Sequence, residues 1–450
     1  MKEAKFLKKL PLSHPAVHCI GIGGIGVSAL AELLLEGNFA VSGSDSELNS
    51  ICEELQKKGA VIAPAGHRVE NLPATGCGGA VMTAAVNINN VEVRELLRRG
   101  VMVWSRGEFL AELARCYQRP VMVAGSHGKS STAAMLGWIF TEMHLDPGLV
   151  IGAKYSNDSS NARLGSGDLL VAESDESDGT HSLSHGELAL ITNIDGDHAW
   201  TAAARSEQEQ EFQRFARQFT QTLYIAEENT DRLLQDIPNC HGLRGGELVE
   251  LEAMAPDFML GYERRNAALA LAAVKYLKLD IKAAAGALQS YPGIRRRQSE
   301  ICRGTAPTVI LLEDYAHHPR EVASSLEVIR TRYAASSITL VFQPHRYKRL
   351  QHYFDDFVKI LSDKTVAVKV LPVFSAWDNP VIDAPDSAQL AQAINAAGGN
   401  AEFYAGITED TAKKIYETTL AGNENAVIAL IGAGDIEKLT PYLKKLILRQ

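Results

Sequence analysis

Apolar and polar positions along the chain alternate between two rhythms. From Val17 to about Cys116, short apolar runs that fit strands, the first at 17–20, alternate with stretches such as 27–37, whose apolar residues recur with a helical period. Strands that alternate with helices predict parallel sheets of the α/β class. This part of the chain is therefore predicted to be a parallel α/β unit.

The same rhythm continues in two further blocks. In the middle block we predict strands at 120–124, 169–173 and 189–194. This block ends near Gly293, where alanine-rich helical segments give way to Pro292 and a run of three arginines. In the last block we predict a helix at 320–333 and strands at 308–315, 338–343, 365–371 and 426–434. We therefore expect three domains, at residues 1–116, 117–292 and 293–450.

Composition and charge narrow the functional classes. The 450 residues, 46% apolar and 22% charged, fit a globular enzyme, and the net charge of −9 disfavours a nucleic-acid partner. The six cysteines are scattered without a C-x-x-C pair, which fits a reducing compartment. Neither a signal peptide nor a long apolar stretch occurs, so we expect a cytoplasmic protein without membrane insertion.

A glycine motif follows the first predicted strand. Gly21, Gly23 and Gly26 form G-x-G-x-x-G at a strand-to-helix turn, where backbone amides can approach a pyrophosphate. Asp45 follows the next strand, where an acidic group can meet a ribose. The motif alone leaves three interpretations open: a nicotinamide or flavin site, another nucleotide diphosphate, or tight packing.

A second glycine turn gives a stronger signal. In Gly125-Ser126-His127-Gly128-Lys129-Ser130-Ser131, a strand, a turn, a lysine, a hydroxyl and a helix follow in that order. Such a turn cradles phosphates with its amides, the lysine reaches the β and γ oxygens, and the hydroxyl can bind Mg²⁺. The spacing is shorter than G-x-x-x-x-G-K-[ST], so we interpret it as a variant of the phosphate loop, with an ordinary turn as the alternative.

Acidic groups and an imidazole follow two strands of the middle block. Glu173 ends the run at 169–173, and Asp195, Asp197 and His198 come after the run at 189–194. Parallel strands end at the same sheet edge, so Glu173 and His198 near Lys129 suit Mg²⁺ that is held partly by ATP oxygens. We expect most of the carboxylates at 175, 176 and 178 to be solvated.

The last block carries Arg297 and two polar segments, 313–319 and 342–347, at or after strands. Zinc binding by His317 and His318 is disfavoured, because adjacent residues on an extended segment point to opposite faces. The basic and hydroxyl residues from Gln343 to Arg349 either bind a substrate anion or form a solvated surface.

These motifs together resemble the Mur ligase family, in the family's order and over nearly the whole chain. The segments that carry the resemblance are GIGGIGVSALAE, SGSD, GSHGKSST, AESDESDGT, ITNIDGDH, LEDYAHHP, FQPHRY and IGAGDI. The resemblance implies a Rossmann-like N-terminal domain that binds a UDP-sugar, and a P-loop-like central ATPase domain with a parallel-rich sheet. It also implies a Rossmann-like C-terminal domain that closes over the active site.

By motif position, the resemblance assigns roles to individual residues. For the UDP-sugar they are Gly21, Gly23, Gly24, Gly26, Asp45 and Thr83. For ATP they are Gly125, Ser126, His127, Gly128, Lys129, Ser130, Ser131, Asn266, Arg297 and Asp314. The Mg²⁺ ligands are Ser130, Glu173 and His198, the amino-acid side has His345 and Arg346, and the catalytic set is Lys129, Glu173, His198 and Arg297.

The sequence departs from the family pattern at three places. Ser130 stands where the family normally has Thr. The family's H-N-x-x-N is here 262–266, with Glu263 in place of one asparagine. Trp377 lies in a segment where alanine-adding members often read Y-P-A-G-E.

The resemblance implies an ATP- and Mg²⁺-dependent amide ligase of peptidoglycan precursor synthesis that acts as a monomer or homodimer. It would join L-alanine to UDP-N-acetylmuramate through an acyl phosphate. Addition of a tripeptide to the same UDP-sugar is the alternative, although FQPHRY and IGAGDI are more like the alanine-adding members. A nicotinamide-dependent oxidoreductase leaves the lysine-bearing turn, Glu173 and His198 unexplained. A non-enzymatic nucleotide sensor would bind without turnover.

Overall fold

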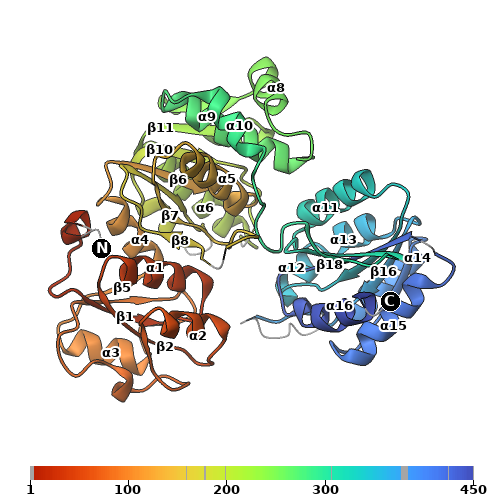
Figure 1. The fold of residues 1–450 in the computed structure, drawn as a ribbon, viewed down its shortest axis with the longest axis horizontal. Helices are drawn as coiled ribbons and strands as arrows, with labels where there is room; N and C mark the ends of the chain where they lie inside the picture. The colour runs from red at the N-terminus through yellow and green to blue at the C-terminus, as the bar shows by residue number, and fades with distance from the viewer. Residues whose placement is uncertain are drawn as a thin grey trace. The chain divides into compact units, whose positions relative to one another are not determined.

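The computed structural model describes residues 5–158, 160–176, 179–197, 199–305, 307–376, 384–423 and 425–448. The chain divides into two compact units, Met1–Gly293 and Ile294–Gln450. The predicted α/β class is confirmed, since the described residues form three sheets with mostly parallel pairing and helices beside them (Figure 1). Within these residues, every helix is too short or too polar to span a bilayer.

The first sheet is parallel throughout and has the order β3-β2-β1-β4-β5. Its strands are β1 (Ala16–Ile20), β2 (Ala40–Ser44), β3 (Val61–Ile62), β4 (Gly79–Met82) and β5 (Val103–Ser105). The helices of this region are η1 (Lys5–Lys9), α1 (Ile25–Glu36), α2 (Ser50–Lys57), η2 (Val69–Asn71), α3 (Val91–Arg98) and α4 (Arg106–Ala114). β1 is flanked by β2 and β4, so the carboxyl ends of these three strands meet at one edge.

The second sheet has the order β12-β11-β10-β6-β9-β7-β8, and only the pair β7 and β8 is antiparallel among its described strands. The strands are β6 (Arg119–Ala124), β7 (Gly148–Val150), β8 (Ala162–Arg163), β9 (Leu169–Glu173), β10 (Gly186–Ile191), β11 (Phe219–Ile225) and β12 (Cys240–Leu243). The helices are α5 (Lys129–Glu142), η3 (Thr180–Leu183), α6 (Ala202–Arg217), α7 (Glu228–Leu234), α8 (Gly245–Ala253), α9 (Tyr262–Tyr276) and α10 (Ile281–Leu288). α5, α9 and α10 pack against one another (Figure 1).

The strand predicted at 189–194 is shifted, because β10 starts at Gly186 and ends at Ile191. The strand ends at Ile191 because the side chains of Thr192 and Asn193 donate hydrogen bonds to the His127 carbonyl and hold this segment against the glycine turn. A run of apolar and β-branched residues alone does not reveal where such contacts end a strand.

The first two sheets belong to one compact unit. Asn161 Nδ2, just before β8, donates to the Ile25 carbonyl at 3.2 Å, and the Leu164 amide donates to Glu36 at 2.7 Å. One apolar core runs from Leu30 and Phe109 beside the first sheet to Phe212 beside the second. The division of this unit at residue 116 therefore stays a prediction, while the second unit begins at Ile294.

The second unit contains the third sheet, in the order β13-β14-β18-β15-β16-β17, with β13 antiparallel to β14. Its strands are β13 (Ser299–Arg303), β14 (Thr308–Asp314), β15 (Ser337–Phe342), β16 (Val366–Val370), β17 (Asn400–Phe403) and β18 (Asn425–Ile431). Its helices are α11 (Pro319–Arg332), α12 (Tyr347–His352), α13 (Phe354–Leu361), α14 (Ser387–Ala396), α15 (Glu409–Leu420), η4 (Ile436–Leu439) and α16 (Thr440–Leu448). Separate apolar clusters cover its two faces.

Candidate active site

The glycine turn between β6 and α5 forms a cradle of backbone amides. Gly125 has φ +134° and Gly128, the N-cap of α5, has φ +82°, and both conformations favour glycine. The turn follows the carboxyl end of β6, which has parallel partners on both sides. The N-terminus of α5 presents unpaired amides and the positive end of its dipole there. This geometry suits a phosphate group.

Side chains that follow β10 hold the turn in place. Asn193 accepts a hydrogen bond from the His127 amide and donates one to the His127 carbonyl, both at 2.9 Å. Thr192 Oγ1 donates to the same carbonyl at 2.5 Å, and the Asp195 amide donates to Ser126 Oγ at 2.9 Å. The sequence assigns no role to Thr192 and Asn193, because the predicted strand at 189–194 includes both residues, whereas β10 ends at Ile191.

Lys129, the first residue of α5, turns its ammonium back over the loop. Nζ donates to the carbonyls of Gly125 at 2.7 Å and Ser126 at 3.3 Å, and it lies 2.8 Å from Glu176 Oε2. Burial lowers the pKa of Lys129, but the carboxylates around it more than offset this, so the pKa lies above its ordinary value. The lysine is therefore a cation at neutral pH.

Glu176 is an exception to the expectation that most of the carboxylates at 175, 176 and 178 are solvated, and Asp178 lies outside the described residues. The Glu176 side chain is only 2% exposed and pairs with Lys129, whereas the Asp175 side chain is 41% exposed and lies 3.8 Å from Arg106. Burial raises the pKa of Glu176 to about 7 against the opposing pull of Lys129. Sequence reasoning failed here because alternation along an irregular segment does not show which carboxylate turns inward.

Ser130 and Glu173 lie together beside the loop. Ser130 Oγ donates to Glu173 Oε2 at 2.7 Å, and the Gly152 amide donates to the same oxygen at 2.8 Å. β9 delivers Glu173 to this point because it is parallel to β6 and ends at the same edge. The two oxygen-bearing side chains predicted to bind a metal are thus adjacent. His198, the third predicted ligand, lies outside the described residues.

Asn266, on α9, faces the N-cap of α5. A Cβ at Gly128 would come within 2.7 Å of Asn266 Oδ1, so the amide side chain lies directly against the turn. Only a residue without a side chain fits at position 128. Ser131, on the first turn of α5, is partly exposed.

The residues predicted to bind the UDP-sugar gather at the carboxyl ends of β1, β2 and β4. Gly21 has φ +78°, and a Cβ there would come within 2.3 Å of Thr83 Cγ2. Asp45 Oδ2 accepts a hydrogen bond from the Gly23 amide at 2.8 Å. Gly24 is the N-cap of α1, and a Cβ at Gly26 would come within 2.6 Å of Arg106 Cδ. The glycines therefore permit both the turn and its close packing.

In the second unit, Arg297 and Asp314 both lie near Tyr315. The Arg297 guanidinium lies 5.4 Å from the Tyr315 ring centroid and 3.4 Å from Glu321 Oε1. Asp314 ends β14, accepts a 2.7 Å hydrogen bond from Ser325, and is buried. Burial raises the pKa of Asp314, and Arg297 opposes that shift.

His345 and Arg346 follow β15 at the same edge of the third sheet. The His345 ring stacks on Phe374, with centroids 5.5 Å apart, and its Nδ1 lies 3.0 Å from Nη1 of the buried Arg349. Arg346 has φ +70°, and its amide donates to the Phe374 carbonyl at 2.8 Å. Trp377, singled out as a departure from the family pattern, lies outside the described residues.

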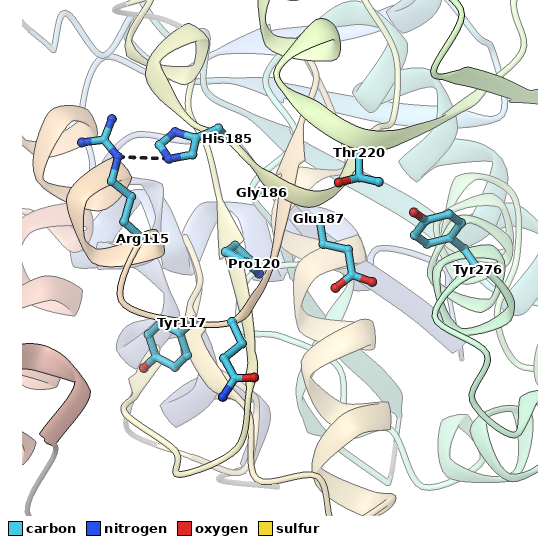
Figure 2. A pocket seen from close by; sticks show the side chains of 9 residues that line it. Arg115, Tyr117, Pro120, His185, Gly186, Glu187, Thr220 and Tyr276 are labelled. Carbon is cyan, nitrogen blue, oxygen red and sulfur yellow. Dashed lines mark hydrogen bonds between the residues drawn. The ribbon is translucent and has the colours of Figure 1, made fainter. Parts of the chain in front are cut away.

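A separate pocket of about 500 Å³ lies at the opposite edge of the second sheet (Figure 2). Its lining includes Pro120, Gly186 and Thr220, at the amino ends of β6, β10 and β11. Arg115 Nε donates to His185 Nε2 there at 3.0 Å. The phosphate-loop turn lies at the carboxyl ends of β6 and β10, so this pocket is not part of the candidate active site.

The turn, the buried lysine and the parallel sheet define an α/β enzyme with a phosphate loop. Two family models match the chain: "Mur ligase family, catalytic domain" over residues 16–118, and "Mur ligase, glutamate ligase domain" over residues 296–434. The chain is 33% identical over 467 residues to UDP-N-acetylmuramate–L-alanine ligase of Thiobacillus denitrificans, an alignment that covers 95% of this chain and 97% of that protein. The chain belongs to the Mur ligase family.

Solved structures show the same fold. UDP-N-acetylmuramate–alanine ligase of Thermotoga maritima superposes with a TM-score of 0.78 at 23% identity, over 97% of this chain and 100% of that one. A murein peptide ligase of Psychrobacter arcticus gives a TM-score of 0.64 at 18% identity, over 96% and 98% of the two chains.

Proposed function

We propose that this chain is an ATP-dependent amide ligase that joins L-alanine to the lactyl carboxylate of UDP-N-acetylmuramate, in cytoplasmic peptidoglycan precursor synthesis. The observation that carries the proposal is the glycine turn closed by Lys129, with Ser130 and Glu173 beside it. The choice of L-alanine is supported by the name and full-length match of the Thiobacillus denitrificans relative.

The reaction has two chemical steps. A carboxylate oxygen of the sugar attacks the γ-phosphorus of ATP, the bond to the β-phosphate oxygen breaks, and an acyl phosphate and ADP form. The uncharged amine of L-alanine then attacks the acyl carbon, and the tetrahedral intermediate expels phosphate as the amide forms and the nitrogen loses a proton. The energy of ATP makes amide formation favourable.

The chain's own residues supply charge and position. Amides of the turn from Gly125 to Lys129 bind phosphate oxygens, and the Lys129 ammonium neutralises charge on the transferred phosphoryl group. In the second unit, Arg297 is proposed to act on the phosphoryl group and Asp314 on the ribose. The loop with Gly21, Gly23 and Asp45 is proposed to bind the uridine diphosphate.

Ser130 and Glu173 fit a magnesium site. A hydroxyl and a carboxylate are the oxygen ligands that Mg²⁺ prefers, and both lie next to a phosphate-binding turn, where Mg²⁺ usually completes its shell with phosphate oxygens and water. When bound, Mg²⁺ would shield the negative charge of the phosphates.

Phosphate release by the purified protein tests this proposal. We expect release to require ATP, UDP-N-acetylmuramate and an amino acid, with kcat/KM for L-alanine roughly tenfold or more above that for glycine, which lacks one methyl group. If the tripeptide of the murein stem supports turnover and L-alanine does not, the recycling reaction replaces the proposed one. A nicotinamide-dependent absorbance change with no phosphate release would refute both.

A further inference from the structure

The ammonium of Lys129 contacts oxygen atoms of two kinds. Nζ donates to the carbonyls of Gly125 at 2.7 Å and Ser126 at 3.3 Å, and it forms an ion pair with Glu176 Oε2 at 2.8 Å. The carbonyls are neutral and belong to the turn itself. Glu176 is the charged partner and comes from a different segment, beyond the end of β9.

Among the residues that the structure describes, Lys129 is the one cation within ion-pair distance of the buried Glu176 carboxylate. The Glu176 side chain is 2% exposed and that of Lys129 is 13% exposed, so water screens the pair weakly. Separating such a pair leaves one charge buried without compensation, which is unfavourable unless another charge replaces the lost partner. An anion that binds the Lys129 ammonium therefore has to compete with the Glu176 carboxylate, which is already in contact with it.

While Glu176 is ionised, a phosphate oxygen and the Glu176 carboxylate cannot both use the ammonium without mutual repulsion. Two anions within a few ångström of each other disfavour one another by Coulomb's law, most strongly where water is excluded. The two carbonyls belong to the backbone of the turn, so they cannot move away from the ammonium without changing the shape of the turn. The Glu176 side chain can rotate away and leave the turn intact. Glu176 is therefore the partner that a phosphate would displace.

We propose that Glu176 is a positioning residue that holds Lys129 over the turn and competes with the β- and γ-phosphates for its charge, thereby setting nucleotide affinity. This inference rests on the proposed function, because it requires a nucleotide triphosphate at this turn. It gives Glu176 a role separate from that of Glu173, whose Oε2 accepts from Ser130 and from the Gly152 amide.

The substitution Glu176→Gln tests the competition, because glutamine keeps the size and a carbonyl acceptor but removes the charge. We expect the affinity for ADP, measured by titration calorimetry, to rise by roughly tenfold or more, the effect of freeing one charge-assisted contact. Affinity for AMP, which has no β-phosphate for the lysine to reach, should stay within about twofold. A merely structural role would change both nucleotides alike.

Two further variants serve as a control and as a substitute for Glu176→Gln. Glu187→Gln removes a carboxylate that pairs with Arg119 at 2.7 Å, at the amino end of β10, and should leave ADP affinity unchanged. If Glu176→Gln does not fold, Glu176→Asp keeps the charge but draws it back by one methylene, and ADP should then bind more tightly than to the wild type. Unchanged or weaker ADP binding in the folded variant overturns the inference.

The same titration separates this inference from the proposed function. Lys129→Ala should weaken ADP binding if the turn holds the nucleotide. If Lys129→Ala weakens ADP binding and Glu176→Gln fails to strengthen it, only the role of Glu176 is wrong. If Lys129→Ala has no effect on ADP binding, the assignment of the turn is wrong, and the inference fails with it.

Discussion

At the scale of single residues, the site depends on side chains that reach the phosphate-loop turn from neighbouring strands. The turn, Lys129 and Ser130 were predictable, because their order along the chain matches the chemistry of phosphate binding. Thr192, Asn193 and Glu176 were not, because their roles depend on which way each side chain turns after its strand ends. Motifs thus reveal the turn and its lysine better than they reveal the side chains that hold the turn in place.

Ser130 offers a test of the magnesium site. Ser130→Ala should lower kcat by roughly tenfold to a hundredfold and raise the Mg²⁺ concentration needed for half-maximal activity, because one oxygen ligand beside Glu173 is lost. Ser130→Thr keeps the hydroxyl and should retain most activity. The measurement is initial rate against Mg²⁺ concentration, and an unaltered Mg²⁺ dependence in Ser130→Ala would remove Ser130 from the site.

Gly125 tests the shape of the turn. A Cβ at Gly125 would come within 2.1 Å of Thr192 Oγ1, and φ of +134° is unsuited to other residues. Gly125→Ala should therefore weaken ATP binding by at least about tenfold. Gly246→Ala, in α8 and in open space, is the control and should leave binding unchanged. Equal ATP affinities in the two variants, measured by calorimetry, would contradict the close fit described for the turn.

At the scale of elements, strands buried on both faces were predictable and edge strands were not. β6 and β9 stand out as apolar runs because parallel neighbours and helices cover them. β3 and β8, at sheet edges, have only two residues each, too few to form a recognisable pattern. The edge strands contribute less to the candidate site, because the site lies at the carboxyl ends of the central strands.

A buried carboxylate ties α3 to the end of β2. Glu92 is fully buried and accepts hydrogen bonds from Ser44 Oγ at 2.5 Å, Asn71 Nδ2 at 2.7 Å and the Arg68 amide at 3.1 Å. Burial alone would raise the pKa of Glu92, but the His18 imidazole, 3.9 Å from Oε2, and the hydrogen bonds from Ser44, Asn71 and the Arg68 amide hold it at about 2. The network fixes the segment next to Asp45.

Glu92 gives a pH-dependent prediction for stability. The folded pKa lies below the unfolded value of about 4.3, so ionised Glu92 stabilises the fold above that pH, and its contribution is lost as the pH falls towards 2. Glu92→Gln should lower the free energy of unfolding by about 2–4 kcal/mol at pH 7. Urea unfolding should show this deficit shrinking between pH 7 and pH 3.

The exposed Glu250, on α8, provides the control for that experiment. Glu250→Gln should change stability by less than about 0.5 kcal/mol at either pH. A deficit in Glu92→Gln that stays constant over the whole pH range would mean that the lost contacts, and not the charge, account for the effect.

At the scale of the whole molecule, the alternation of strands and helices, the order of the motifs and the family matches all indicate the same α/β fold. The sequence rhythm predicted parallel sheets throughout, and the family models match residues 16–118 and 296–434, on either side of the phosphate-loop turn. The boundary at residue 116 stays a prediction, because the apolar core that includes Phe109 and Phe212 joins the first two sheets.

The most direct test of the account is the rate of ADP formation by Lys129→Ala with ATP, UDP-N-acetylmuramate and L-alanine all present. The variant should lose at least about a thousandfold in kcat, because the buried ammonium that neutralises the transferred phosphoryl group is gone. Lys275→Ala, which removes an exposed lysine from α9, should match the wild type. A folded Lys129→Ala protein whose substrate-dependent rate stays within about threefold of the wild type would contradict the claim that this turn transfers the phosphoryl group.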